Sequence, residues 1–412
     1  FQAAVGGEVG GGWLMVDSGG VASYVTSSQG TTDGLAAERD SVVIARAVAG
    51  AAVVEPRHGF SEQQLLSRFK DAGVAYTLAK VLAREAYDID TRVYLLDNSG
   101  STSTADGHVV AKSGTNGVYT STRSTRWDEV RCVALDQANW GAAVGVRCEF
   151  WLLNPPCPSQ PVEGRDYIVV DSANGQSSSQ VEALERLLEK NGPRGPTPLV
   201  SRMQEVRRRL QRSLAVAGGK RVVLTIVTDG MPTSPNNGTS TSRDRMEFAH
   251  ELRTFTMSFN CSVVIRLTTD EESVVNFYNE IDSELEVPLD ILDDLAGEAQ
   301  EVYRSGNGWL TYTPLIHRIR EAGTSEKIFD LLDERTLNEV EIATFLEFLF
   351  RDQHDPPFPR DAKGLLEAVD AALDTFAPVF DGRRSRMAPP VNRELLRRAL
   401  SGPKRCTVCV LM

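Results

Sequence analysis

One short stretch constrains this chain more than any other: the apolar run Val93–Leu96, followed directly by Asp97, Ser99 and Ser101 in an Asp-x-Ser-x-Ser pattern. Four consecutive apolar residues predict a short buried strand. In an open α/β sheet, ligands bind at the carboxyl ends of the strands. The side chains gathered at this end offer only oxygen atoms, which are the ligands that Mg²⁺ and other hard cations prefer. The stretch therefore predicts a partly open divalent-metal site.

Composition limits the kind of protein that carries this site. The 412 residues are 41% hydrophobic and 24% charged, which is typical of a soluble globular chain of two or three domains. The net charge of −12 argues against general nucleic-acid binding and suits a protein that holds a cation. No apolar run reaches the roughly 18 residues that span a bilayer. The six cysteines lack zinc spacing and disulfide-scaffold density, which favours reduced thiols in the cytosol.

Apolar strand patterns alternate with amphipathic helical patterns across residues 89–305. This alternation predicts an α/β fold, a doubly wound and mostly parallel sheet with helices on both faces. Within it, Asn116-Gly117 separates two β-prone runs and predicts an inserted hairpin at about 102–124. A solvent-exposed loop is the alternative for this insertion. Further strands are expected at Val146–Leu153, Tyr167–Val170, Arg221–Thr228 and Cys261–Leu267, with an edge strand at Val287–Leu292.

The remaining segments flank this α/β region. Residues 1–40 are rich in Gly, Ser, Thr and Ala without a sustained period, and they predict a flexible arm. Residues 41–88 form a helical lead-in, and residues 306–380 predict a wholly helical region without chemistry of its own. Residues 381–412 form a basic tail. The predicted architecture is thus an α/β domain with N- and C-terminal helical additions.

Two more segments supply oxygen ligands at corresponding places. Thr197 lies in the Gly- and Pro-rich loop 192–199, and Asp229 follows a second buried strand that ends at Thr228. In this order, Asp97-Asn98-Ser99-Gly100-Ser101, Gly195-Pro196-Thr197-Pro198-Leu199 and Thr228-Asp229-Gly230 resemble the von Willebrand factor type A domain with its metal-ion-dependent adhesion site. The resemblance covers roughly residues 89–305, and it implies a Rossmann-like fold.

The resemblance also implies a role for each residue. Ser99 and Ser101 would ligate the metal through their hydroxyls, and Thr197 would be a third ligand, directly or through water. Asp97 and Asp229 would hold coordinated waters. Few direct carboxylates leave Mg²⁺, or Mn²⁺ or Ca²⁺ in its place, open to a carboxylate from outside. The implied function is metal-dependent protein binding, in which a partner presents an Asp or Glu to the metal. The 102–124 insertion departs from the family pattern, in which a helix follows the serines closely.

Two other functions compete with this one. A Mg²⁺-dependent phosphoryl-transfer enzyme also places an Asp at a strand end, but the aspartyl-nucleophile type carries a second acid two residues later, where this chain has Ser99. The chain also lacks a Gly-x-x-x-x-Gly-Lys-Ser/Thr phosphate loop. We therefore expect a protein that is not an enzyme. A scaffold that keeps the motif without binding metal is the second alternative.

The last four residues form a Cys-aliphatic-aliphatic-Met sequence that begins at Cys409 and resembles a prenylation box. A single lipid anchors only marginally, and Cys406 offers a site for a second chain within the basic tail. Because prenyl groups are added in the cytosol, this pattern predicts a cytoplasmic protein anchored to the cytoplasmic face of a membrane. A frayed apolar terminus with two incidental cysteines is the alternative.

Overall fold

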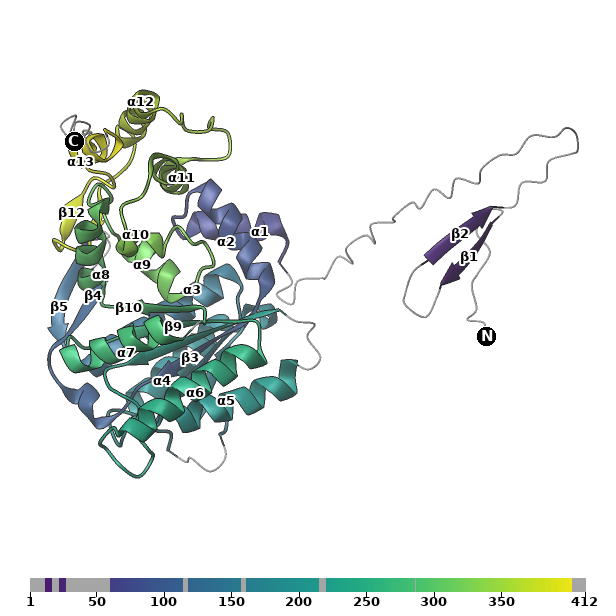
Figure 1. The fold of residues 1–412 in the computed structure, drawn as a ribbon, viewed down its shortest axis with the longest axis vertical. Helices are drawn as coiled ribbons and strands as arrows, with labels where there is room; N and C mark the ends of the chain where they lie inside the picture. Colours follow the sequence, from purple (N-terminus) through teal and green to yellow (C-terminus); the bar gives the residue numbers. More distant parts are fainter. Residues whose placement is uncertain are drawn as a thin grey trace, which may run out of the picture. The chain divides into compact units, whose positions relative to one another are not determined.

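The computed structural model describes residues 12–16, 22–26, 60–113, 118–156, 161–214, 220–285 and 287–401. Contacts divide the chain into two units, Phe1–Val54 and Glu55–Met412 (Figure 1). In the first unit, β1 (Gly12–Val16) pairs antiparallel with β2 (Ala22–Thr26). A hairpin therefore stands where the sequence predicted only a flexible arm. The rest of that arm lies outside the described residues, as do the predicted lipidation sites Cys406 and Cys409.

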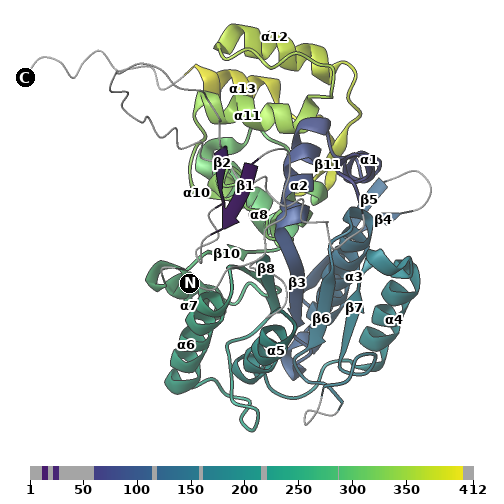
Figure 2. The ribbon, with the colours of Figure 1, turned by 90° about the vertical axis from the view of Figure 1, so that its right-hand side faces the viewer.

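The second unit is built on a six-stranded sheet with the order β10-β9-β8-β3-β6-β7 (Figure 2). All neighbouring strands are parallel except β6 and β7, which are antiparallel. The chain extends the sheet first on one side of β3 and then on the other, so the strand order switches between β3 and β8. This result confirms the predicted α/β fold with a mostly parallel sheet. The strands are β3 (Ile89–Leu96), β6 (Cys148–Leu152), β7 (Tyr167–Val170), β8 (Arg221–Thr228), β9 (Cys261–Leu267) and β10 (Leu289–Leu292).

Helices cover both faces of the sheet. Along β3, Val93 and Leu95 pack in one core while Tyr94 and Leu96 pack in another. Successive side chains of a strand point to opposite faces, so both faces of β3 are buried. The first core includes residues of α5, α6 and α7, and the second includes residues of α3 and α4. These helices are α3 (Arg126–Val144), α4 (Ser177–Lys190), α5 (Leu199–Leu214), α6 (Ser242–Ser258) and α7 (Glu272–Glu284).

The N- and C-terminal helices share a third core, which also includes Val223 of β8. Phe329 is fully buried in this core, with ring centroids 5.4 Å from Phe345 and 6.3 Å from Phe348. The helical region is therefore part of the same compact unit as the sheet. Its helices are α1 (Glu62–Asp71), α2 (Tyr76–Asp88), α8 (Leu295–Val302), α9 (Pro314–Glu321), α10 (Leu331–Glu334), α11 (Glu339–Phe350), α12 (Ala362–Leu373) and α13 (Arg393–Leu400).

The segment predicted to be wholly helical also contains a strand. β11 (Val379–Asp381) pairs antiparallel with β12 (Arg386–Ala388), which lies in the predicted basic tail together with α13. Phe380 is buried, and its ring lies 5.4 Å from that of Tyr119. Two strands of three residues are too short to show a period in the sequence, and this packing partner is distant along the chain. In the described part of the chain, no helix is long and apolar enough to cross a bilayer.

The inserted hairpin is present, with β4 (Gly107–Ser113) paired antiparallel to β5 (Val118–Ser124). The register pairs Gly107 with Ser124, which brings the base of the hairpin back to the start of α3. The side chain of Thr125 caps α3 and forms a capping box with Asp128. The paired strands confirm the predicted hairpin in place of an irregular loop, while its predicted turn, Asn116-Gly117, lies outside the described residues.

The shared core predicts how the unit unfolds. Replacing Phe329 with Ala should lower the free energy of unfolding by about 3–5 kcal/mol, because the change leaves a cavity among buried rings. Val340→Ala on α11 is the matched control, because Val340 is 62% exposed, and it should change stability little. Urea unfolding followed by circular dichroism measures both. A helical region that melts separately from an unchanged sheet would contradict the shared core.

Candidate metal centre

The candidate site lies at the carboxyl ends of β3 and β8, where the strand order switches. Asp97 follows β3 immediately and is completely buried. Its carboxylate accepts a hydrogen bond of 2.8 Å at Oδ1 from the Ser99 amide and one of 2.6 Å at Oδ2 from the Thr228 hydroxyl. Its own amide donates to the Val227 carbonyl at 2.9 Å. Asp97 is therefore fixed in position by both strands.

A chain of short polar contacts joins the serines to Asp229. The hydroxyl oxygens of Ser99 and Ser101 are 3.0 Å apart, and the Ser101 hydroxyl donates to Asp229 Oδ1 at 2.9 Å. Ser99 and Asp229 are buried, whereas Ser101 is exposed. Ser101 lies in the 3₁₀ turn η1 (Gly100–Ser103). The structure thus brings four of the five predicted site residues into one connected group that opens to solvent at Ser101.

The fifth residue, Thr197, arrives on a loop held against the same end of the sheet. The Gly100 amide donates to the Gly195 carbonyl at 2.9 Å, and the Thr197 amide donates to the Thr233 hydroxyl at 2.9 Å. A Cβ placed on Gly230 would lie 3.4 Å from Thr197 Oγ1, so this hydroxyl borders the residue that follows Asp229. Within the described residues the Thr197 hydroxyl makes no hydrogen bond, which leaves its oxygen available to a ligand.

Two asparagines that the sequence did not single out brace the site. Asn98 Nδ2 donates to the Asn154 carbonyl at 3.0 Å, and the Asn154 amide donates to Asn98 Oδ1 at 2.8 Å. Asn154 Nδ2 also donates to the Pro196 carbonyl at 2.7 Å. These contacts join the segment after β3 to the Gly- and Pro-rich loop. The one signal available in the sequence was the position of Asn154 directly after a predicted strand.

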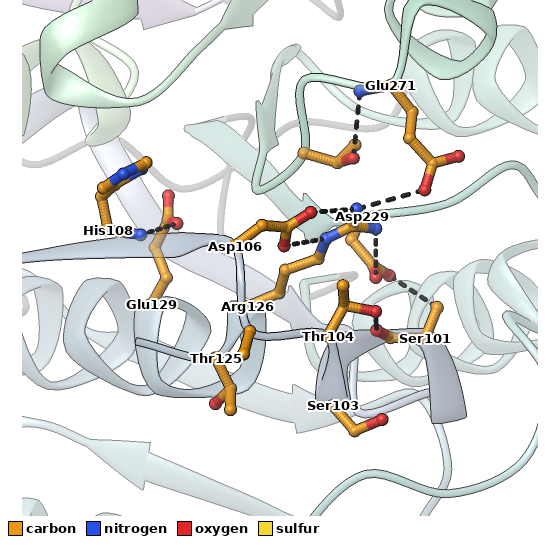
Figure 3. Close-up of polar contacts among 12 residues, drawn as sticks. Ser101, Ser103, Thr104, Asp106, His108, Thr125, Arg126, Glu129, Asp229 and Glu271 are labelled. Atoms are coloured by element: carbon orange, nitrogen blue, oxygen red, sulfur yellow. Dashed lines mark hydrogen bonds and ion pairs between the residues drawn. The ribbon is translucent and has the colours of Figure 1, made fainter. Parts of the chain in front are cut away.

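The sequence also did not single out Arg126, the first residue of α3. Its Nη1 lies 3.1 Å from Asp229 Oδ2, and its Nε and Nη2 each lie 2.7 Å from an oxygen of Asp106 (Figure 3). Nη2 is also 3.1 Å from Glu271 Oε1. The Arg126 side chain is 4% exposed, so this ion pair with Asp229 is buried. No local pattern marked Arg126, because its partners come from three other segments.

Burial dominates the electrostatics of the two aspartates. It raises the pKa of Asp97 to about 7, and the neighbouring charge of Asp229 adds to the rise, while hydrogen bonds from Thr228 and Ser99 lower it. Burial also raises the pKa of Asp229, against the lowering effects of the hydrogen bonds from Ser101 and Arg126. Two buried carboxylates are costly to ionise together, and a nearby cation relieves that cost.

The donor set fits a hard divalent cation. Two hydroxyls and two carboxylates form one connected group, the Thr197 hydroxyl borders it at Gly230, and all of these ligand atoms are oxygen, the type that Mg²⁺, Mn²⁺ and Ca²⁺ bind. A second oxygen cluster, formed by Glu298, Glu301 and Asp333, has carboxylate atoms within 4.8 Å of one another. There, the buried Arg320 guanidinium pairs with two of the three acids, Glu298 and Asp333, whereas Arg126 pairs with only one of the two acids at β3 and β8. The group at β3 and β8 is the better candidate.

Comparisons with known proteins leave the family of this chain open. No family model matches it, and no curated protein matches it. One similar solved structure is the crystal structure of the pilus adhesin SpaC from Lactobacillus rhamnosus GG, at 16% identity and a TM-score of 0.33. The match covers 49% of this chain and 28% of the adhesin chain. A likeness of this size carries no argument about fold or function.

The geometry of the loop that carries Thr197 predicts that a substitution at Gly195, which is not one of the proposed ligands, changes the affinity for Mg²⁺. Gly195 has φ +72°, and a Cβ there would lie 2.9 Å from Asn154 Oδ1. Gly195→Ala should cost roughly 1–2 kcal/mol of strain, and should weaken Mg²⁺ binding up to about tenfold by moving Thr197. Gly192→Ala is the control, because nothing lies within 4 Å of its Cβ position. Calorimetric titration of both variants measures the effect, and equal affinities would exclude a role of the loop in the site.

Proposed function

We propose that this chain is a divalent-metal-dependent protein-binding module of the von Willebrand factor type A kind. The observation that carries the proposal is the convergence of three segments distant in sequence on one sheet edge. Ser101 links Ser99 and Asp229 there by contacts of 3.0 and 2.9 Å. The position at the switch of the strand order, where doubly wound sheets bind ligands, supports the same conclusion.

In this proposal the chain's own residues hold and orient the cation. Ser99, Ser101 and Thr197 would supply hydroxyl oxygens, while Asp97 and Asp229 would supply negative charge and orient water. When bound, the cation supplies an electrophilic position for a carboxylate of a partner protein. The neutral hydroxyls are important here, because direct carboxylate ligands would weaken the attraction for that outside group.

The environment of Asp97 favours a binding module over a phosphoryl-transfer enzyme. In the enzyme alternative this carboxylate would be the nucleophile, which needs access to a phosphoryl group. Asp97 is completely buried, and both of its oxygens already accept hydrogen bonds of 2.8 and 2.6 Å.

Removing one hydroxyl tests the metal site. Ser99→Ala should abolish Mg²⁺ binding to metal-stripped protein in calorimetry, because it deletes one of the three hydroxyl ligands at the edge of the sheet while leaving the core intact. Ser103→Ala is the matched control in the same turn, since the Ser103 hydroxyl is exposed and donates only to the Gly100 carbonyl, at 2.8 Å. Unchanged Mg²⁺ affinity in Ser99→Ala would refute the site assignment.

The binding function needs a separate test. The full chain, immobilised and exposed to extract from its native cells, should retain a protein in Mg²⁺ that EDTA releases and that Ser99→Ala fails to retain. The protein retained should lose binding when its exposed acids are changed to amides, because its carboxylate would complete the metal shell. If the chain binds Mg²⁺ but captures no protein in a Mg²⁺-dependent way, the metal site stands and the protein-binding function is rejected.

A further inference from the structure

The Arg126 guanidinium places a fixed positive charge inside the candidate metal centre. The inserted hairpin ends at Ser124, and the Arg126 amide donates to the Thr104 carbonyl at 3.0 Å, which joins the start of α3 to the segment after η1. From there the guanidinium reaches Asp229 in the centre of the site (Figure 3). The two oxygens of the Asp229 carboxylate accept from different donors: Oδ1 accepts from the Ser101 hydroxyl and Oδ2 from the Arg126 guanidinium.

We propose that Arg126 is a resident counter-ion that sets the metal affinity of this site: it holds Asp229 in place without metal and weakens divalent-cation binding. The inference rests on the proposed function and adds its regulation. The guanidinium stays charged at all working pH values. Its ion pair with Asp229 neutralises part of the negative charge that would attract a divalent cation, and its own positive charge repels that cation.

The magnitude of this repulsion is large enough to measure. Charges a few ångströms apart at an effective dielectric of about 20 interact strongly enough to change an affinity by about tenfold or more, and burial limits screening by salt. Asp106 and Glu271 offset part of it, because both also contact the guanidinium. Their side chains are 42% and 57% exposed, so their charges are better screened than that of Asp229. The Arg126 side chain is only 4% exposed, so its charge is screened less than theirs, and in this proposal its repulsion of a cation exceeds the part that the two acids offset.

The contacts also tie the insertion to the site. Asp106 immediately precedes β4 and binds Arg126 through both oxygens at 2.7 Å. A Cβ on the next residue, Gly107, would lie 2.7 Å from the Thr125 carbonyl oxygen, so the base of the hairpin is tightly packed against the start of α3. The hairpin thus holds Arg126 in a fixed orientation, which lowers the entropy cost of its pairing with Asp229.

Calorimetric titration of Mg²⁺ into metal-stripped protein tests the charge directly. Arg126→Gln should bind Mg²⁺ at least about tenfold more tightly than the wild type, and Arg126→Lys, which keeps the charge, should stay closer to the wild type. Arg123→Gln is the matched control, because Arg123 is exposed on the same hairpin and donates to the Ala105 carbonyl at 2.9 Å without reaching Asp229. It should bind like the wild type.

A second readout follows stability rather than affinity. In EDTA, Arg126→Gln should melt at a lower temperature than the wild type, because Asp229 loses its buried partner. On adding Mg²⁺, the melting temperature of Arg126→Gln should rise by more than that of the wild type, because a cation that binds the folded state more tightly stabilises it more. If the single variant does not fold, the double variant Arg126→Gln/Asp106→Asn removes the unpaired Asp106 charge and carries the same expectation of tighter binding.

The outcomes separate this inference from the function on which it rests. Equal Mg²⁺ affinity in the wild type and the Arg126→Gln chain would overturn the counter-ion role and leave the metal site standing. Weaker binding in Arg126→Gln would overturn it as well, since Arg126 would then only position Asp229. No Mg²⁺ binding by any of the folded variants would reject both the metal site and the counter-ion.

Discussion

Two carboxylates buried at the ends of neighbouring strands are the constraint on which this structure depends. Asp97 follows β3, Asp229 follows β8, and both are almost inaccessible to solvent. Buried charges are costly unless they are paired or hydrogen-bonded, and the surrounding structure supplies such partners from several elements. Backbone amides, the hydroxyls of Thr228 and Ser101, and the Arg126 guanidinium all point at these two groups. A divalent cation would complete the same compensation.

The helical additions stabilise the helix that carries Arg126. Arg266, at the carboxyl end of β9, lies 2.7 Å from Glu129 on α3 and 3.0 Å from Glu321 on α9. All three side chains are buried. The same Glu129 accepts a hydrogen bond of 3.0 Å from the His108 amide of the hairpin. A region without evident chemistry therefore fixes the orientation of the hairpin, of α3 and of the site that they border.

The elements that the sequence predicted well are those with local signals. The run at Val93–Leu96 had to be a buried strand because every side chain is apolar, and Asn116-Gly117 between β-prone runs predicted the hairpin. The five candidate site residues came from the order of three motifs along the chain, which resembles the von Willebrand factor type A domain. β11 and β12 were missed because three-residue strands carry no period, and because Phe380 packs against Tyr119, which is distant along the chain.

The sequence by itself determined the mostly parallel sheet and the two acids, Asp97 and Asp229, that follow its central strands, because the largely apolar runs before these acids are buried on both faces. Only the tertiary structure decided which charged groups surround those two acids. Asp106, Asp229 and Glu271 lie on three segments with no shared pattern, and the folded chain brings all three to the Arg126 guanidinium. Coulomb interactions depend on distance in space, which the order of residues along the chain does not contain.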